Sequence, residues 1–156
     1  SDSSFEIRQI LRHKKRFLDL LLLADEQESM IDLYLERGEM FALYDQNILK
    51  TICVVTVEGG KTSELKNIAT DPQYQKQGYG KRLIRFISEH YAGKYDTLLV
   101  GTGESPLTIP FYAQNGFKYS HRIKDFFTDN YDHPIYEDGK QLVDMVYLRK
   151  ELSKSK

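Results

Sequence analysis

A glycine-rich turn between a strand and a helix carries residues that could bind a phosphate. Gly78 and Gly80 stand at alternate positions directly before an amphipathic helix. Glycine lets the backbone turn sharply and leaves the first helical amides uncovered, where the positive end of the helix dipole also points. Lys76, Lys81 and Arg82 add charge that would oppose this dipole unless an anion lies between them. The sequence therefore predicts a pyrophosphate-binding loop.

The spacing of the glycines decides which phosphate ligand fits. A dinucleotide fingerprint needs G-x-G-x-x-G, and Leu83 stands at the third glycine position. A Walker loop needs an earlier glycine and a Ser or Thr after the lysine, and this chain has Gln75 and Arg82 there. What remains is Gln75-x-x-Gly78-x-Gly80. This pattern resembles the acetyl-CoA pyrophosphate loop of the GNAT superfamily of acyltransferases.

Two further markers resemble the same family. The segment Phe111-Tyr112-Ala113-Gln114-Asn115-Gly116-Phe117 is similar to its helix-to-strand signature of Tyr followed by Gly-Phe, and Glu64 stands early in the strand before the loop. The resemblance extends from Phe5 to Leu148. It implies a single domain over residues 1–156 with the α/β GNAT fold. That fold is a mixed, mostly antiparallel central sheet of about six to seven strands, flanked by about four helices.

The hydrophobic periodicity predicts elements in the order that this resemblance implies. Residues 5–10 alternate as a strand does, and residues 13–24 have helical spacing, followed by a short helix that ends near Gly38. The predicted strands after this point are 40–44, 48–57, 63–70, 97–100, 117–127 and 141–148. Helices are predicted after Gly80 and over about 106–114, where Asn115-Gly116 is typical of a helix end.

Transfer of an acyl group to an amine requires a deprotonated nucleophile. An amine with a pKa of about 10.4 is neutral in only about one molecule in 2,500 at pH 7, a cost of about 4.6 kcal/mol, so a positioned base is useful. Strand alternation places Glu64 on one face with Ile68 and Thr70. The resemblance implies the same role, often through a water. The alternative is an exposed glutamate paired with Lys61 or Lys66, and as a base Glu64 would need burial to raise its pKa.

Tyr112 is the candidate that meets the departing sulfur. A phenol with a pKa of about 10 would protonate a thiolate near 8.5 uphill, by roughly 2 kcal/mol. We therefore expect Tyr112 to donate a hydrogen bond that stabilises the developing thiolate, with full proton transfer left open. The alternative is that Tyr112 only packs beside Phe111 and Phe117.

The resemblance also implies which residues bind acetyl-CoA as co-substrate. A free backbone N–H where two strands diverge would polarise the carbonyl, and the end of the strand before the loop would pair with the pantetheine arm. Ser105 stands where many family members carry an Asn, and Thr70 where they more often have Val. The expected cofactor-binding residues are Ile68, Ala69, Thr70, Gln75, Lys76, Gln77, Gly78, Tyr79, Gly80, Lys81, Ser105 and Tyr112. No metal is expected, since the four histidines show no metal-ligand spacing.

The segment 124–139 is the most individual part of the chain. A loop of this length between two strands is usually functional or disordered, and its aromatic residues argue against disorder. Aromatic walls with carboxylates would suit a cationic amine, so Asp125, Tyr131 and Asp132 are the predicted acceptor-binding residues. The turn 25–28 could add a second acidic edge. The alternative is that the aspartates are solvated turn residues and the aromatics form a dimer contact.

Composition limits the remaining function classes. A net charge of −1 gives no reason to expect a nucleic-acid partner, and the apolar run 20–24 is too short to span a membrane. The single Cys53 excludes an intrachain disulfide and fits a reducing cytoplasm. We expect a cytoplasmic N-acetyltransferase that acts on a small-molecule or peptide amine by direct transfer in a ternary complex, with room for a homodimer. The alternative is a non-catalytic acyl-CoA-binding or regulatory module on the same fold.

Overall fold

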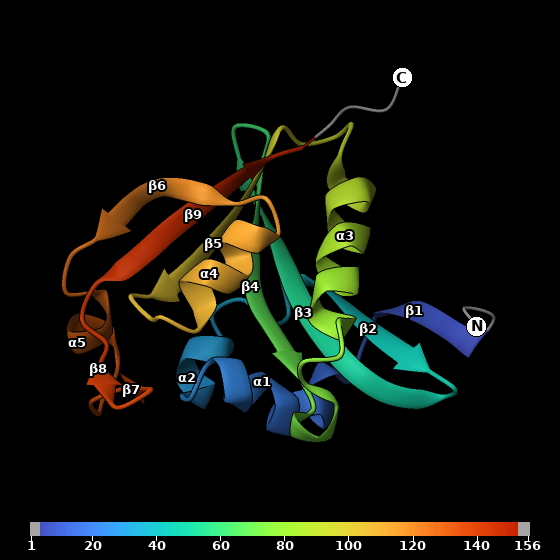
Figure 1. The fold of residues 1–156 in the computed structure, drawn as a ribbon, viewed down its shortest axis with the longest axis horizontal. Helices are drawn as coiled ribbons and strands as arrows, with labels where there is room; N and C mark the ends of the chain where they lie inside the picture. Colours follow the sequence, from blue (N-terminus) through green and yellow to red (C-terminus); the bar gives the residue numbers. More distant parts are fainter. Residues whose placement is uncertain (1–3, 153–156) are drawn as a thin grey trace.

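The computed structural model describes residues 4–152 and is built around a seven-stranded sheet in the order β1-β2-β3-β4-β5-β9-β6 (Figure 1). Strands β4 and β5 are parallel, and the other neighbouring strands are antiparallel. The strands are β1 (Phe5–Ile10), β2 (Glu39–Asp45), β3 (Ile48–Gly59), β4 (Thr62–Thr70), β5 (Thr97–Gly103), β6 (Lys118–Ile123) and β9 (Met145–Glu151). The predicted mixed, mostly antiparallel sheet is confirmed. The ends of the predicted domain, residues 1–3 and 153–156, lie outside the described residues.

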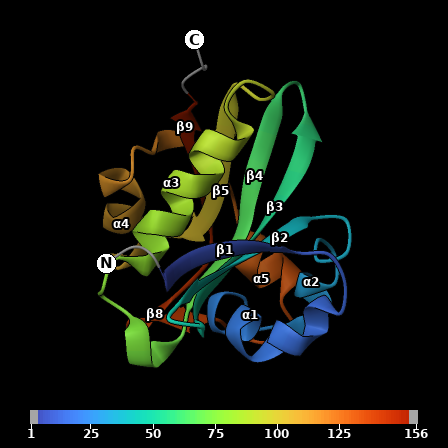
Figure 2. The same cartoon turned by 90° about the vertical axis from the view of Figure 1, so that its right-hand side faces the viewer.

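Five α-helices lie within residues 4–152, one more than the sequence predicted. They are α1 (Leu18–Ala24), α2 (Glu28–Ile31), α3 (Tyr79–Tyr91), α4 (Thr108–Gln114) and α5 (Phe126–Asn130). Short 3-10 turns precede α1 as η2 (Lys14–Phe17) and α3 as η3 (Pro72–Tyr74), and β7 (Tyr136–Glu137) pairs with β8 (Lys140–Gln141) in a separate hairpin. Figures 1 and 2 show α5 and this hairpin near α1 and α2, at one end of the molecule.

Helices cover both faces of the sheet. The apolar side of α3 and α4 packs on one face, with Leu83, Ile87 and Tyr112 among the buried residues. Helices α1 and α2 pack on the other face, where Leu21 and Ile31 have no exposed surface. Each face of the sheet is thus covered by its own pair of helices. An opening between two central strands would connect the two covered faces.

The segment predicted as a strand over 117–127 ends earlier than expected. Strand β6 stops at Ile123, and Phe126 begins α5. Asp125 has a left-handed φ of 58° and its amide donates to Asp144 Oδ1 at 2.9 Å, so the chain turns there. The turn buries Phe127 in a small apolar cluster with Ile135 and Leu142. This tertiary burial, rather than strand alternation, decides the local structure.

Strand β4 contains a bulge that the sequence did not predict. Leu65 lies opposite Val55 and Asn67 opposite Val54, so Lys66 is an extra residue without a partner on β3. The bulge shifts the alternation by one position, and Leu65 and Ile68 therefore both pack on the α3 face, whereas Asn67 faces α1. The prediction that Glu64 shares a face with Ile68 and Thr70 is wrong, because Glu64 lies on the opposite face.

Strands β4 and β5 separate directly after this point. Leu65 and Val100 form the last pair in their parallel register. Beyond it β5 continues along β9 through Gly103, while β4 continues along β3 alone. The second half of β4 therefore has one edge free of strand pairing, which is the strand divergence that the resemblance implied.

Candidate active site

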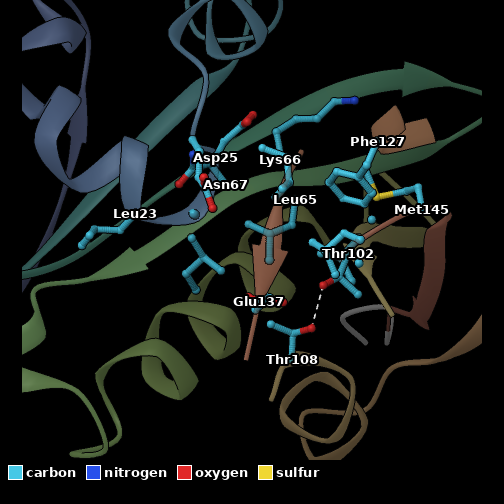
Figure 3. Close-up of a pocket in the computed structure, with 18 of the residues that line it drawn as sticks. Leu23, Asp25, Leu65, Lys66, Asn67, Thr102, Thr108, Phe127, Glu137 and Met145 are labelled. Carbon is cyan, nitrogen blue, oxygen red and sulfur yellow. Dashed lines mark hydrogen bonds between the residues drawn. The ribbon is translucent and has the colours of Figure 1, made fainter. Parts of the chain in front are cut away.

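A cavity of about 260 Å³ occupies the opening between β4 and β5 (Figure 3). Thr108 and Tyr112 of α4 line it from one face of the sheet, and Asp25 and Phe127 line it from the other. The cavity therefore extends through the sheet. Its other lining residues are Leu23, Ala24, Glu26, Leu65, Lys66, Asn67, Ile68, Val100, Gly101, Thr102, Gly103, Tyr131, Ile135, Tyr136, Glu137, Leu142 and Met145.

The predicted phosphate loop has an uncovered helix start. Gly78 caps α3 with a left-handed φ of 87°, and among the described residues no side chain accepts from the first amides of this helix. A Cβ at Gly78 would meet no heavy atom within 4 Å, so the space above the amides is open. Lys76 and Lys81 are exposed beside it. Open amides, the helix dipole and two lysines at this loop are features that favour an anion.

Other contacts fix the loop to the sheet. Gln75 Nε2 donates to the carbonyl of Thr70 at 3.2 Å, which joins the loop to the end of β4. Gly80 packs so that a Cβ would lie 3.4 Å from Phe111 Cζ, close to the α4 helix. The open start of α3 thus lies beside the end of β4, the strand whose preceding residues Leu65 to Ile68 line the cavity.

Glu64 is buried, but it does not line the cavity. Its side chain is 8% exposed, and Oε2 lies 3.0 Å from Lys66 Nζ and 3.2 Å from the Tyr147 hydroxyl, which donates to it. Burial and the nearby Glu64 carboxylate raise the pKa of Tyr147, so this hydroxyl stays protonated. The alternative interpretation of Glu64 was an exposed glutamate paired with Lys61 or Lys66. The structure shows the pair with Lys66, but Glu64 is buried.

Tyr112 lines the cavity from α4 between two aromatic neighbours. Its ring makes edge contacts with Phe111 and Phe117, at centroid distances of 5.2 and 5.6 Å. Burial raises the pKa of Tyr112, and the negative charge of Glu137 adds to this effect. No described residue forms a hydrogen bond with its hydroxyl. The phenol is therefore a protonated donor at the cavity.

Ser105 is buried at 2% exposure and begins the α4 region. Its Oγ accepts from the amide of Leu107 at 3.1 Å, and its carbonyl accepts from the amide of Ile109. The hydroxyl hydrogen remains available as a donor. The serine thus has a structural role beside any contact with a cofactor arm.

The three predicted acceptor-binding residues do not come together at the cavity. Tyr131 lines it and donates to Asp25 Oδ1 at 2.7 Å. Asp125 turns the chain before α5, and the Asp132 side chain is 78% exposed. Neither aspartate lines the cavity.

Asp25, and neither of the later aspartates Asp125 and Asp132, lines the cavity beside Tyr131. Its carboxylate accepts from the Tyr131 hydroxyl at Oδ1 and from the Tyr34 hydroxyl at Oδ2, the latter at 3.0 Å. Burial raises the pKa of Asp25, and the tyrosine and Gln27 amide donors offset this only in part. The sequence offered Asp25 only as part of an acidic turn, and Asn67 and Glu137 gave no signal. Only the fold shows that they meet at one cavity.

Metal ligands and membrane-spanning helices are absent from the described range. In residues 4–152 no group of three or more His, Cys, Asp and Glu side chains is arranged to hold a metal ion. No helix in the same range has the length and apolar character needed to cross a membrane. Cys53 is fully buried, and this burial raises the pKa of its thiol, so it is a core residue.

Several known proteins are similar to this chain in both sequence and fold. Residues 36–119 match the family model described as an acetyltransferase (GNAT) domain. The uncharacterized N-acetyltransferase YvbK of Bacillus subtilis is 39% identical over 137 residues, which cover 86% of this chain and 88% of that protein. A GNAT family acetyltransferase from Elizabethkingia anophelis, solved with acetyl-CoA bound, is 33% identical with a TM-score of 0.88, over 96% of this chain and 99% of the other. A Bacillus subtilis acetyltransferase in complex with CoA is 34% identical with a TM-score of 0.86, over the same shares.

Proposed function

Because the chain belongs to the GNAT acetyltransferase family, we propose that it moves an acetyl group from acetyl-CoA to a primary amine within a ternary complex. The cavity between β4 and β5 carries this proposal, because it joins the α4 side of the sheet to the side of α1 and α5. Two substrates could enter from opposite faces and meet in the opening. Direct transfer needs such a meeting point.

The residues of the chain fit a CoA thioester. The open start of α3 at Gly78, with Lys76 and Lys81, supports binding of the pyrophosphate. The free edge of β4 at Ile68, Ala69 and Thr70 supports backbone pairing with the pantetheine arm. Gln77, Tyr79 and Ser105 stay in the proposed contact surface on the sequence prediction alone. Acetyl-CoA supplies an acyl group on a leaving thiolate. The two relatives of this chain that were solved with acetyl-CoA or CoA support acetyl-CoA as the co-substrate.

Tyr112 would stabilise the leaving thiolate by donating a hydrogen bond. Its hydroxyl is protonated, borders the cavity and has no hydrogen-bond partner among residues 4–152. A donor held ready at the point where charge develops lowers the barrier without reorganisation during the reaction.

Glu64 is the proposed acceptor of the amine proton, acting through a water. Lys66 lines the cavity and its Nζ lies 3.0 Å from Glu64 Oε2, whereas Glu64 itself does not line the cavity. Direct contact between Glu64 and the amine is therefore not the proposed route. One water molecule between the reacting nitrogen and Glu64 would carry the amine proton to the carboxylate.

The test measures thiol release from acetyl-CoA with a panel of amines, alongside CoA binding by calorimetry in the same preparation. We expect CoA binding together with amine-dependent release. Binding without release from any amine would favour the non-catalytic module. Failure to bind CoA would contradict the proposed role of the loop from Gln75 to Gly80.

A further inference from the structure

The carboxyl group of Asp25 has only neutral partners among the described residues. Its donors are the hydroxyls of Tyr34 and Tyr131 and the backbone amide of Gln27. No Lys, Arg or His within residues 4–152 forms an ion pair with it. A partly buried charge without a countercharge costs free energy, so it is expected mainly where a ligand supplies the missing charge.

The charges around the cavity favour a cation. Among the lining residues the carboxylates are Asp25, Glu26 and Glu137, and the only ammonium is that of Lys66. The Lys66 ammonium is already paired with Glu64, at 3.0 Å. The described cavity therefore holds an excess of negative charge that an incoming ammonium would neutralise.

A buried amide extends the set of acceptors beside Asp25. Asn67 Nδ2 donates to the Leu21 carbonyl and to the Tyr34 hydroxyl, both at 3.0 Å, and this fixes the orientation of the amide. Its Oδ1 is left without a hydrogen-bond partner among the described residues, although Asn67 is only 3% exposed. Figure 3 shows Asp25 and Asn67 on the same wall of the pocket. This wall carries more acceptors than donors.

Apolar side chains also line the cavity where the amine would bind. Leu23, Phe127 and Met145 line the cavity (Figure 3), and the rings of Phe127 and Tyr131 stack at 5.5 Å. Aromatic faces add to the attraction for an ammonium. A volume of about 260 Å³, shared with the acetyl end of the co-substrate, limits the acceptor to a small molecule.

We infer that Asp25 is the specificity-determining residue of the acceptor site and that it binds the ammonium of a compact primary amine with an apolar body. The inference rests on the proposed function, because it concerns the second substrate of the same cavity. Tyr34 and Tyr131 hold the carboxylate in place from opposite sides, one hydroxyl on each oxygen. The proton that leaves the amine before transfer still passes to Glu64 through water.

The test uses binding rather than turnover. The protein saturated with CoA is titrated by calorimetry with 2-phenylethylamine, with spermidine as an extended polycation and with 2-phenylethanol as an uncharged analogue of similar shape. We expect the compact amine to bind best. Asp25→Asn should weaken its binding at least tenfold and leave 2-phenylethanol unaffected.

Asp19→Asn is the matched control, because Asp19 is an exposed aspartate of α1, the helix that ends directly before Asp25, and does not line the cavity. It should leave amine binding unchanged. Unchanged CoA affinity in Asp25→Asn shows that the variant is folded, and Asp25→Ser is the second variant if that affinity falls. Equal amine affinity in wild type and variant, or a preference for spermidine, would overturn the inference. Loss of CoA binding in the wild type would instead contradict the proposed function.

Discussion

Glu64 and Lys66 form an ion pair of 3.0 Å at the bulge of β4, with the carboxylate behind the cavity wall and the lysine within it. Without the bulge, residues 64 and 66 would be ordinary neighbours on one face of a strand. Here Lys66 is the extra residue of the bulge, and of the two partners it alone lines the cavity. The geometry therefore favours proton removal through water over direct contact.

Replacement of Glu64 by Gln should lower turnover and leave CoA binding unchanged. The variant keeps the size of the side chain and removes the proton acceptor, and a general base typically contributes about 10²-fold or more to the rate. Steady-state kcat and calorimetric CoA affinity check this. Glu58→Gln is the control, because Glu58 is also ion-paired on the sheet, with Arg37, and does not line the cavity. Equal turnover in Glu64→Gln would remove Glu64 from the mechanism.

Replacement of Tyr112 by Phe should affect turnover and not stability. The Tyr112 hydroxyl has no hydrogen-bond partner in residues 4–152, so its removal leaves no buried group unsatisfied and the edge contacts of the ring remain. We expect kcat to fall about 10²-fold, as for loss of one transition-state donor, with the free energy of unfolding changed by less than about 0.5 kcal/mol. Denaturant unfolding and kcat separate the two effects. An unchanged kcat would assign Tyr112 to packing alone.

The role of the loop can be tested with two glycines of the same geometry. Gly78 and Gly59 have φ values of 87° and 89°, and a Cβ at either position meets no heavy atom within 4 Å. Alanine at each should therefore cost a similar free energy of unfolding, about 1–2 kcal/mol, from the left-handed backbone. Only Gly78→Ala adds a side chain at the start of α3, so only this variant should weaken CoA binding. Equal CoA affinity in both variants would contradict the phosphate-binding role.

Local sequence signals predicted several elements well. The β2–β3 hairpin turns at Gln46 and Asn47, both with positive φ, and its place at Asp45-Gln46-Asn47 was predicted. The helix predicted after Gly80 is present as α3, which begins two residues earlier, at Tyr79. It could be predicted because glycine spacing and apolar periodicity act within a few residues. The role of this loop in binding CoA stays a prediction.

Features that depend on distant contacts were not predictable. The bulge at Lys66 has no glycine or proline to mark it, and it arises from the pairing of β4 with β3. Asp25 and Tyr131 are 106 positions apart in the chain and meet only because α5 folds back onto the end of α1. The acidic loop could therefore be recognised as distinctive, but which of its residues reach the cavity could not.

The last prediction concerns the pH dependence of stability, which Asp25 should influence in the direction opposite to an ion-paired aspartate. Burial raises its pKa in the folded state above the ordinary value of 3.8, so the folded protein holds this proton more tightly than the unfolded chain does. Stability rises with pH only where the unfolded state binds more protons, so this group lowers stability as pH rises above 3.8 through its folded pKa.

Asparagine at position 25 does not titrate, so it removes this loss of stability with rising pH. The stability of Asp25→Asn relative to wild type should therefore increase between pH 3 and pH 7, as measured by denaturant unfolding across that range. Asp19→Asn, in the helix that ends directly before Asp25, corrects for the loss of one negative charge. A difference that stays constant with pH would contradict the burial argument. A variant that is more stable at pH 7 and yet binds the amine less well would show that the carboxylate is kept for binding at a cost in stability.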